Sequence, residues 1–180
     1  EPGLLPAYIE RRQNELEESK QQVRQMLPQI ELLRNRGQVL PKVQFFEGRK
    51  GIEQSYEDTL ENNKGKLLLG VTGIEGAYSH LTPEFIKYYT EKRAGLGIHS
   101  IYITPDSKTA REQKENDTRL NRTAKFIPAK YAYNSEITAY DNKVHMVSYA
   151  LENPVAIIIE DETISKTMKI IFEFMKEHSY

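Results

Sequence analysis

The sequence contains no cysteine, and this absence excludes several classes of function at once. Disulfide bonds, thiolate metal sites and cysteine nucleophiles all require that side chain. Long apolar runs are missing as well, because the longest, such as 154-PVAIII-159, fall far short of the roughly 20 residues that a membrane-spanning helix needs. No signal peptide precedes them. We therefore expect a soluble cytoplasmic protein with no membrane partner.

An excess of charge of either sign is also absent. The formal net charge is −1 over 180 residues, so no overall field attracts nucleic acid or an anionic membrane. One stretch, 119-RLNRTAKFIPAK-130, carries four basic residues and no acidic one. It could meet DNA phosphates or an anionic ligand, or it could form an ordinary solvated surface. Any other contact with DNA would need residues that this chain lacks.

Sequence motifs of common catalytic sites are missing too. None of the four histidines is followed two residues later by lysine, and there is no H-E-x-x-H pair, G-x-S-x-G elbow or glycine-rich phosphate loop. The acidic cluster 160-EDE-162 could do acid/base chemistry, but negative charge there also favours the start of the helix that follows. The sequence predicts no catalytic residue, no metal site and no cofactor.

What the sequence does have at its start is a helical pattern with a seven-residue period. Over residues 6–36 the apolar positions repeat as in a coiled coil, with Pro28 as a kink and Gly37 as the end. The chain begins with Glu1 and enters this pattern almost at once, which suggests a fragment of a longer protein. We expect either a dimerising coiled-coil helix over residues 1–40 or an amphipathic helix packed on its own domain. The predicted dimer interface consists of Ile9, Leu16, Val23, Met26, Ile30 and Leu33.

After residue 40 the pattern changes to short apolar runs alternating with helical stretches. Such an alternation is typical of an α/β domain with a parallel core, here over residues 41–180. Continuous apolar character at 66–72 indicates a strand buried on both faces. Thr82 and Pro83 together mark the start of a helix. The predicted strands are 43–46, 66–72, 98–104, 122–127, 136–140, 144–149 and 155–160. The predicted helices are 48–62, 81–93 and 163–177, with 106–121 as a mobile helix or loop.

Two of these segments predict further detail. The cluster Asp141-Asn142-Lys143 favours a turn, so 136–140 and 144–149 should form a hairpin. The last helix should bury one apolar stripe, consisting of Ile164, Met168, Ile171, Phe172 and Met175. Tyr131, Tyr133 and Tyr140 flank the hairpin and suit either a small-molecule pocket or the cover of a sheet edge.

Three segments resemble the effector-binding region of TrmB-like transcriptional regulators. They are 41-PKVQFFEGRKGIEQSYEDTL-60, 122-RTAKFIPAKYAYNSEITAYDNKVHMVS-148 and 155-VAIIIEDETISKTMKIIFEFM-175. The resemblance covers about 140 residues and rests on patterns of packing and turns. It implies a phospholipase D-like mixed sheet flanked by helices and preceded by a long coiled-coil helix. It also implies a dimer whose DNA-binding winged helix-turn-helix lies outside this chain.

Within that resemblance, 134-NSEITAYD-141 stands where phospholipase D-like enzymes carry H-x-K-x-x-x-x-D. Asn134 replaces the histidine and Glu136 replaces the lysine, while Asp141 alone is retained. Asparagine cannot form a phosphohistidine intermediate, and glutamate repels phosphate. Either the strand persists without its chemistry or Asp141 is simply a turn former, and both alternatives deny catalysis.

The leading prediction is therefore a ligand-sensing, dimerising regulatory domain that acts on DNA only through a missing winged helix. Some members of the family sense sugars such as maltose or trehalose, but no residue here carries that specificity over. We expect the effector at the carboxyl ends of the strands. The candidate ligand-binding residues are Thr72, Thr104, Asn134, Glu136 and Ser148. The alternatives are a phospholipase D-like phosphodiesterase and a dimeric scaffold without a ligand.

Overall fold

The computed structural model describes residues 40–149 and 153–180, together with Pro6, Ile9, Glu10, Arg12, Gln13, Glu17, Lys20 and Gln21. The chain divides into two units, Glu1–Leu40 and Pro41–Tyr180, and each is considered by itself. In the first unit the described residues have helical backbone, and Ile9 is 49% exposed. The rest of the predicted interface, Leu16, Val23, Met26, Ile30 and Leu33, lies outside the described residues. The coiled coil therefore remains a prediction.

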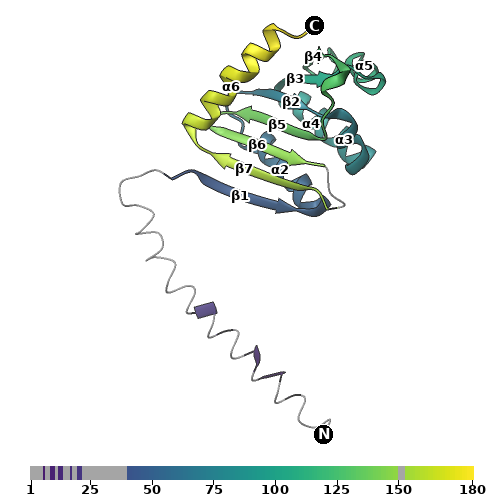
Figure 1. Ribbon diagram of the computed structural model, residues 1–180. Coiled ribbons are helices and arrows are strands. Elements are labelled where there is room, and N and C mark those ends of the chain that lie inside the picture. The colour runs from purple at the N-terminus through teal and green to yellow at the C-terminus, as the bar shows by residue number, and fades with distance from the viewer. Residues whose placement is uncertain are drawn as a thin grey trace. The chain divides into compact units, whose positions relative to one another are not determined.

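The second unit is built on one mixed sheet of seven strands (Figure 1). Its strand order is β1-β7-β6-β5-β2-β3-β4. The strands are β1 (Lys42–Glu47), β2 (Leu67–Thr72), β3 (His99–Pro105), β4 (Arg122–Ile127), β5 (Ser135–Tyr140), β6 (Lys143–Ser148) and β7 (Val155–Glu160). The β2–β3 and β3–β4 pairings are parallel, and the other pairings are antiparallel. The α/β class and the mixed sheet flanked by helices are thus confirmed.

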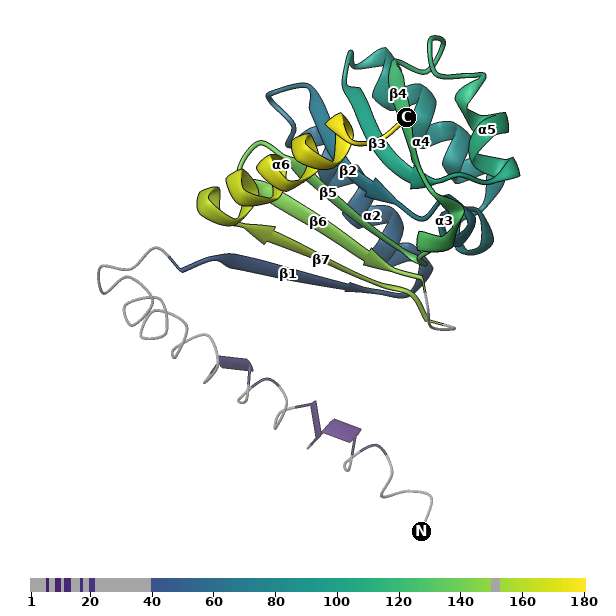
Figure 2. The same cartoon turned by 45° about the horizontal axis from the view of Figure 1, so that its top comes forward.

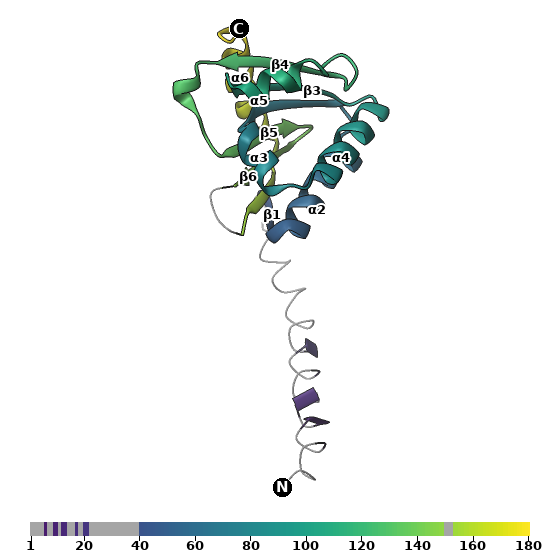
Figure 3. The same ribbon diagram turned by 90° about the vertical axis from the view of Figure 1, so that its right-hand side faces the viewer.

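Helices cover both faces of the sheet. They are α2 (Gly48–Glu61), α3 (Ile74–His80), α4 (Pro83–Gly95), α5 (Lys108–Lys114) and α6 (Glu162–Glu177). Figure 3 shows α2 and α4 on the same side of the sheet, and Figure 2 shows α6 crossing the opposite side. No helix among the described segments is both long and apolar enough to cross a membrane.

Local sequence signals explain most of these elements. The Thr82 side chain accepts a hydrogen bond from the Phe85 amide at 3.2 Å, and Pro83 occupies the first turn of α4, as predicted. Leu68 and Leu69 are buried on opposite faces of β2, which confirms the doubly buried strand. The hairpin is also confirmed, because Tyr140 pairs with Lys143 across the turn.

One helix was not predicted from the sequence, and one segment had been left open between a helix and a loop. Helix α3 was not predicted, because 73-GIEGAYSH-80 contains two glycines and is too short to show a helical period. The charged segment 106–121 contains a defined helix, α5, whose Ser107 side chain accepts from the Ala110 amide at 3.1 Å. Ala110 is fully buried and anchors this otherwise polar helix.

The predicted stripe of α6 is only partly correct. Phe172 is buried and packs on the β2 and β5 residues Leu69 and Ala139, but Ile164 and Ile171 are 37% and 44% exposed. The helix contacts β6, β2 and β5, and Figures 1 and 2 show that it leaves β1 and β7 uncovered on this face. The apolar stripe of α6 is therefore wider than the part of the sheet that the helix contacts.

Candidate functional site

A pocket of about 110 Å³ lies between the sheet and the helices α2, α3 and α4. Strands β2, β3 and β5 form its floor, because Thr72, Ser100 and Glu136 all line it. Gly70 lies between Leu68 and Thr72 on this face of β2 and has no side chain to fill the space. A Cβ there would approach the Ile137 carbonyl oxygen of β5 within 2.1 Å, so glycine is required at this position.

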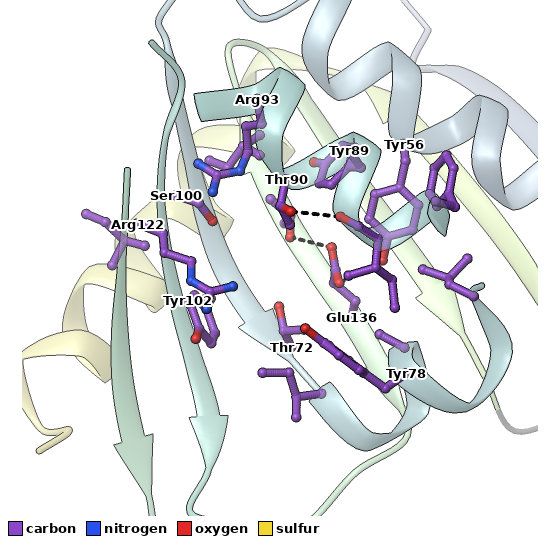
Figure 4. A pocket seen from close by; sticks show the side chains of 18 residues that line it. Tyr56, Thr72, Tyr78, Tyr89, Thr90, Arg93, Ser100, Tyr102, Arg122 and Glu136 are labelled. Atoms are coloured by element: carbon purple, nitrogen blue, oxygen red, sulfur yellow. Dashed lines mark hydrogen bonds between the residues drawn. The ribbon is translucent and has the colours of Figure 1, made fainter. Parts of the chain in front are cut away.

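Glu136 is the most unusual residue in the pocket. Its carboxylate is only 8% exposed and accepts hydrogen bonds from the Tyr56 hydroxyl at 2.9 Å and the Thr138 hydroxyl at 3.2 Å (Figure 4). Burial raises the pKa of Glu136 to about 7, although these hydroxyl groups favour the charged form. The side chain is therefore divided between its neutral and charged forms near neutral pH.

Tyrosine side chains connect Glu136 to the protein interior. The Tyr56 hydroxyl also makes a short hydrogen bond with the Tyr149 hydroxyl, and the Tyr56 ring packs against Tyr89 with ring centres 4.9 Å apart. The Tyr89 hydroxyl is in turn bonded to Thr59 at 2.8 Å. Burial raises the pKa of both Tyr56 and Tyr89, so both rings stay neutral and act as hydrogen-bond donors.

Two arginines line the same pocket, and their surroundings differ. Arg122 is paired with Asp117, with Nε 2.8 Å from Oδ1. Arg93 is 2% exposed and donates instead to the carbonyl oxygens of Ile98, Leu120 and Asn121 at 2.6, 2.6 and 3.0 Å. Burial lowers the pKa of Arg93, but the group stays charged. Its charge is therefore balanced by peptide dipoles rather than by a carboxylate.

Tyr102 adds an unpartnered polar atom to this side of the pocket. Its hydroxyl is buried without a hydrogen-bond partner, and its ring lies 5.6 Å from the Arg122 guanidinium carbon. Native proteins satisfy nearly all buried polar atoms, so an orphaned hydroxyl in a pocket wall marks a place for a ligand atom or a water.

His145 lies close to this network and is completely buried. Its Nε2 is 2.9 Å from the Ser55 hydroxyl, which itself donates to the Ile52 carbonyl at 2.7 Å. Ser55 has a single hydroxyl proton, so His145 must donate from Nε2, which leaves Nδ1 without a partner. Burial lowers the pKa of His145 to about 4 and keeps the ring neutral. This serine and histidine pair is structural, because no substrate can reach it.

The five residues predicted to bind a ligand do not form one cluster. Thr72 and Glu136 line the pocket, whereas Thr104, Asn134 and Ser148 are not among its lining residues. Thr104 is fully buried with an unpartnered hydroxyl, and Asn134 is exposed. The pocket also lies against the face of the sheet, not beyond the strand ends as expected.

Sequence reasoning did not identify the aromatic residues of the pocket. The tyrosines that it singled out lie elsewhere: Tyr131 is 56% exposed, Tyr140 bonds to Asp58 at 2.5 Å, and Tyr133 donates to the Ile103 carbonyl. The lining tyrosines Tyr56, Tyr78, Tyr89 and Tyr102 are spread over three helices and a strand. The only sequence signal for them was the high tyrosine content, 11 residues.

The basic stretch of residues 119–130 does not act as one patch. Arg122 points into the pocket wall beside Asp117, whereas Arg119 is an exposed side chain near Glu91. Among the described residues, no three histidine, aspartate or glutamate side chains come together in a group that could hold a metal ion.

Asp141, the last residue of the octapeptide, has a structural role in the hairpin turn. Its carboxylate accepts from the Lys64 and Gly65 amides at 2.7 and 2.8 Å, and its own backbone has a φ of 40°. It therefore joins the β5–β6 turn to the loop between α2 and β2. It lies outside the residues that line the pocket.

Asp141→Ala should destabilise the domain by about 2 kcal/mol, because two amides lose a charged acceptor and alanine tolerates a positive φ poorly. Asp141→Asn keeps one acceptor oxygen and tolerates this φ, so it should cost less than half as much. Urea unfolding followed by circular dichroism measures both. Equal losses of unfolding free energy in the two variants would contradict a role for the Asp141 carboxylate in holding the Lys64 and Gly65 amides.

This chain is similar to known proteins in fold but not detectably in sequence. No family model and no curated protein sequence matches this chain significantly. Among solved structures, TrmBL2, an archaeal chromatin protein, matches with a TM-score of 0.52 and 14% identity, over 97% of this chain and 67% of that chain.

Two phospholipase D-like structures match the domain as well. Nuc from Salmonella typhimurium, a phospholipase D family member, has a TM-score of 0.59 and 9% identity, over 78% of this chain and 97% of its own. NucT from Helicobacter pylori has a TM-score of 0.57 and 14% identity, over 78% and 98%. At these identities the likeness concerns the fold alone: the chain contains an α/β domain whose fold is similar to those of Nuc, NucT and TrmBL2.

Proposed function

We propose that this chain is the ligand-sensing regulatory part of a TrmB-like DNA-binding regulator. The observation that carries the proposal is the pocket around Glu136, which combines apolar walls with a few convergent polar groups, as small-molecule sites do. The resemblance of three sequence segments to TrmB-like effector regions supports it. The fold likeness to TrmBL2, a chromatin protein for which a mode of DNA binding is described, is compatible with it.

The same geometry argues against phosphodiester hydrolysis. In the register of the octapeptide, the position of the enzymes' lysine is occupied by Glu136, a buried acid that disfavours a phosphate. Asn134 offers no nucleophile in place of the histidine. We therefore propose that the domain has kept the fold without the hydrolytic chemistry. Assays with bis(4-nitrophenyl) phosphate should show no turnover above background, and cleavage lost on Glu136→Ala would contradict this.

A thermal-shift screen tests the sensing role. A ligand that binds only the native state raises its apparent stability, by about 2.7 kcal/mol at one hundred times Kd. We expect at least one class among amino acids, sugars, nucleotides and phosphorylated metabolites to stabilise the protein. The stabilisation by that ligand should be smaller in Tyr102→Phe, a variant of the pocket. It should be unchanged in Tyr88→Phe, the matched control at an exposed position on α4. A screen in which no class stabilises the protein would favour the scaffold alternative.

The assembly is proposed from the heptad pattern of residues 9–33. A dimer through this seam would place two copies of a preceding DNA-binding domain at a fixed spacing, and a ligand could alter that spacing only by binding two states unequally. Light scattering at micromolar concentration should give twice the chain mass. Ile30→Asp should give the mass of one chain, and an unchanged mass would contradict the proposed seam.

A further inference from the structure

The pocket contains a buried acid whose charge is balanced only by hydroxyl groups. Within the described part of the chain no lysine, arginine or histidine forms an ion pair with Glu136, and its hydrogen-bond donors are the hydroxyl groups of Tyr56, Thr138 and Thr72. Burying a carboxylate without a cation is unfavourable. A ligand with a positive group beside Glu136 would provide the missing counter-charge.

Aromatic rings surround the same acid. Tyr56, Tyr78, Phe85 and Tyr89 line the pocket, and the Tyr56 ring meets Phe85 and Tyr89 edge-on with ring centres 6.1 and 4.9 Å apart. Figure 4 shows Tyr56, Tyr78 and Tyr89 around Glu136. Ring faces attract cations, and aromatic groups combined with a carboxylate are a recurring way of binding ammonium groups. A phosphate gains little from such an arrangement, because its negative charge would oppose that of the carboxylate.

The opposite side of the pocket has the complementary charge. Arg93 is buried without a carboxylate partner among the described residues, and the Tyr102 hydroxyl is buried and unpartnered. Ser100 lies on the same strand as Tyr102 and also lines the pocket. Arg122 is already paired with Asp117 and contributes little free charge. These groups suit a carboxylate or another small anionic group.

Sheet geometry sets the separation of the two sides. Glu136 belongs to β5 and Tyr102 to β3, and β2 lies between these strands. Neighbouring strands are about 4.8 Å apart, so the two sides of the pocket are separated by roughly 10 Å at the level of the backbone. The side chains shorten that span. The cavity of about 110 Å³ is partly open to solvent, so it can hold the charged groups of a small molecule without enclosing all of it.

We infer that the pocket binds a small zwitterion of the amino-acid class. Its ammonium group lies between Glu136 and the tyrosine rings, and its carboxylate faces Arg93, Ser100 and the Tyr102 hydroxyl. The inference rests on the proposed sensing function and specifies the chemical class of the effector. A phosphate ester is disfavoured because its charge would face Glu136, and a sugar would leave Glu136 without a counter-charge.

Isothermal titration with matched probes tests the inference at pH 8. The zwitterionic probes are L-alanine, L-leucine and 4-aminobutyrate, and butylamine, butyrate and maltose are the cationic, anionic and neutral comparisons. At least one zwitterion should bind tenfold or more tightly than butylamine and butyrate. Its affinity should fall at least tenfold in Glu136→Gln and should be unchanged in Glu84→Gln, an exposed acid on α4.

The pH dependence provides a second readout. Affinity for the zwitterion should increase from pH 5 to pH 8, because Glu136 must be ionised to face an ammonium group. A ligand that instead accepts a hydrogen bond from neutral Glu136 would lose affinity from pH 5 to pH 8. Binding by maltose and by none of the zwitterions would overturn the inference while leaving the sensing function intact. If butylamine binds as tightly as the best zwitterion, the ligand carboxylate does not interact with the Arg93 side of the pocket.

The two proposals can therefore fail separately. If no molecule of the wider thermal-shift screen stabilises the protein, the sensing function itself fails and the inference fails with it. Circular dichroism of Glu136→Gln checks that lost affinity does not reflect a lost fold. We expect that variant to be folded, because glutamine has the same shape as glutamate.

Discussion

Glu136→Gln should stabilise the domain by about 3 kcal/mol at pH 8 and should leave its stability nearly unchanged at pH 4. In the folded protein, burial holds the pKa of Glu136 at about 7, whereas the ordinary value is 4.5. A shift of this size corresponds to about 3 kcal/mol, since one pKa unit corresponds to about 1.4 kcal/mol. Glutamine is neutral at every pH, and its single carbonyl oxygen can still accept from one of the Tyr56 and Thr138 hydroxyls, as the neutral acid does.

The sign follows from the raised pKa. The stability that neutral Glu136 contributes is fully present below about pH 4.5 and is lost as the pH rises through about 7. Over this window the free energy of unfolding of the natural protein should therefore fall relative to that of the variant. Urea titrations at intervals between pH 4 and pH 8.5 measure the difference. Glu61→Gln, at an exposed end of α2, should show no comparable change.

His145 opposes this trend and has to be considered with it. Its folded pKa of about 4 is below the ordinary 6.5, so its contribution is present above pH 6.5 and is lost as the pH falls through about 4. Between about pH 4.5 and pH 6.5 the two slopes oppose each other. Glu136→Gln should therefore reveal a stability that rises with pH in that range. Parallel curves for the variant and the natural protein would mean that Glu136 is not buried.

Arg93→Ala should destabilise the domain by about 4 kcal/mol. The guanidinium group of Arg93 serves the carbonyl oxygens of Ile98, Leu120 and Asn121, and so it ties the end of α4 to β3 and to the loop before β4. Alanine leaves these buried acceptors without donors, and each such loss costs about 1 to 3 kcal/mol. The removed side chain also leaves a cavity next to Tyr102 and Ser100.

Arg111→Ala is the matched control for this prediction. Arg111 makes two hydrogen bonds of 2.6 Å to Asp106, but its side chain is 67% exposed. Exposed ion pairs contribute about 0 to 1 kcal/mol, so the loss should be small. Urea unfolding measures the free energy of unfolding of both variants. Arg93 would not be a structural residue if the two variants lost similar amounts.

Much of the fold could be predicted because its signals are local. Strand β2 has a continuous apolar run, α4 has a Thr-Pro start, and the β5–β6 turn has adjacent polar residues that favour turns. The exposure of Ile164 and Ile171 could not be predicted in this way. Periodicity identifies an apolar side of α6, but the width of the sheet beneath it depends on strand order, which is not a local property.

The candidate site was harder to predict for a related reason. Glu136 was identified only through its position in the octapeptide, and nothing in the residues near it indicates that it is buried. Arg93 lies in the last turn of a helix, where a solvent-exposed cation is the usual interpretation. Tyr56, Tyr89 and Tyr102 lie on α2, α4 and β3, and they come together only because these two helices pack against the same face of the sheet. Such a site depends on long-range pairing that single-sequence patterns do not contain.

The clamp formed by Asp141 has a consequence for how such domains diverge. Because its carboxylate holds the Lys64 and Gly65 amides, selection for a stable fold is enough to retain an acid at this position. The side chains of Asn134 and Glu136 do not accept from these amides. Substitutions at their positions could therefore remove catalytic residues from a domain of this fold, and the aspartate would still be retained. An aspartate at this turn is therefore a record of shared ancestry or shared folding, and it is a poor guide to whether a descendant still cleaves anything.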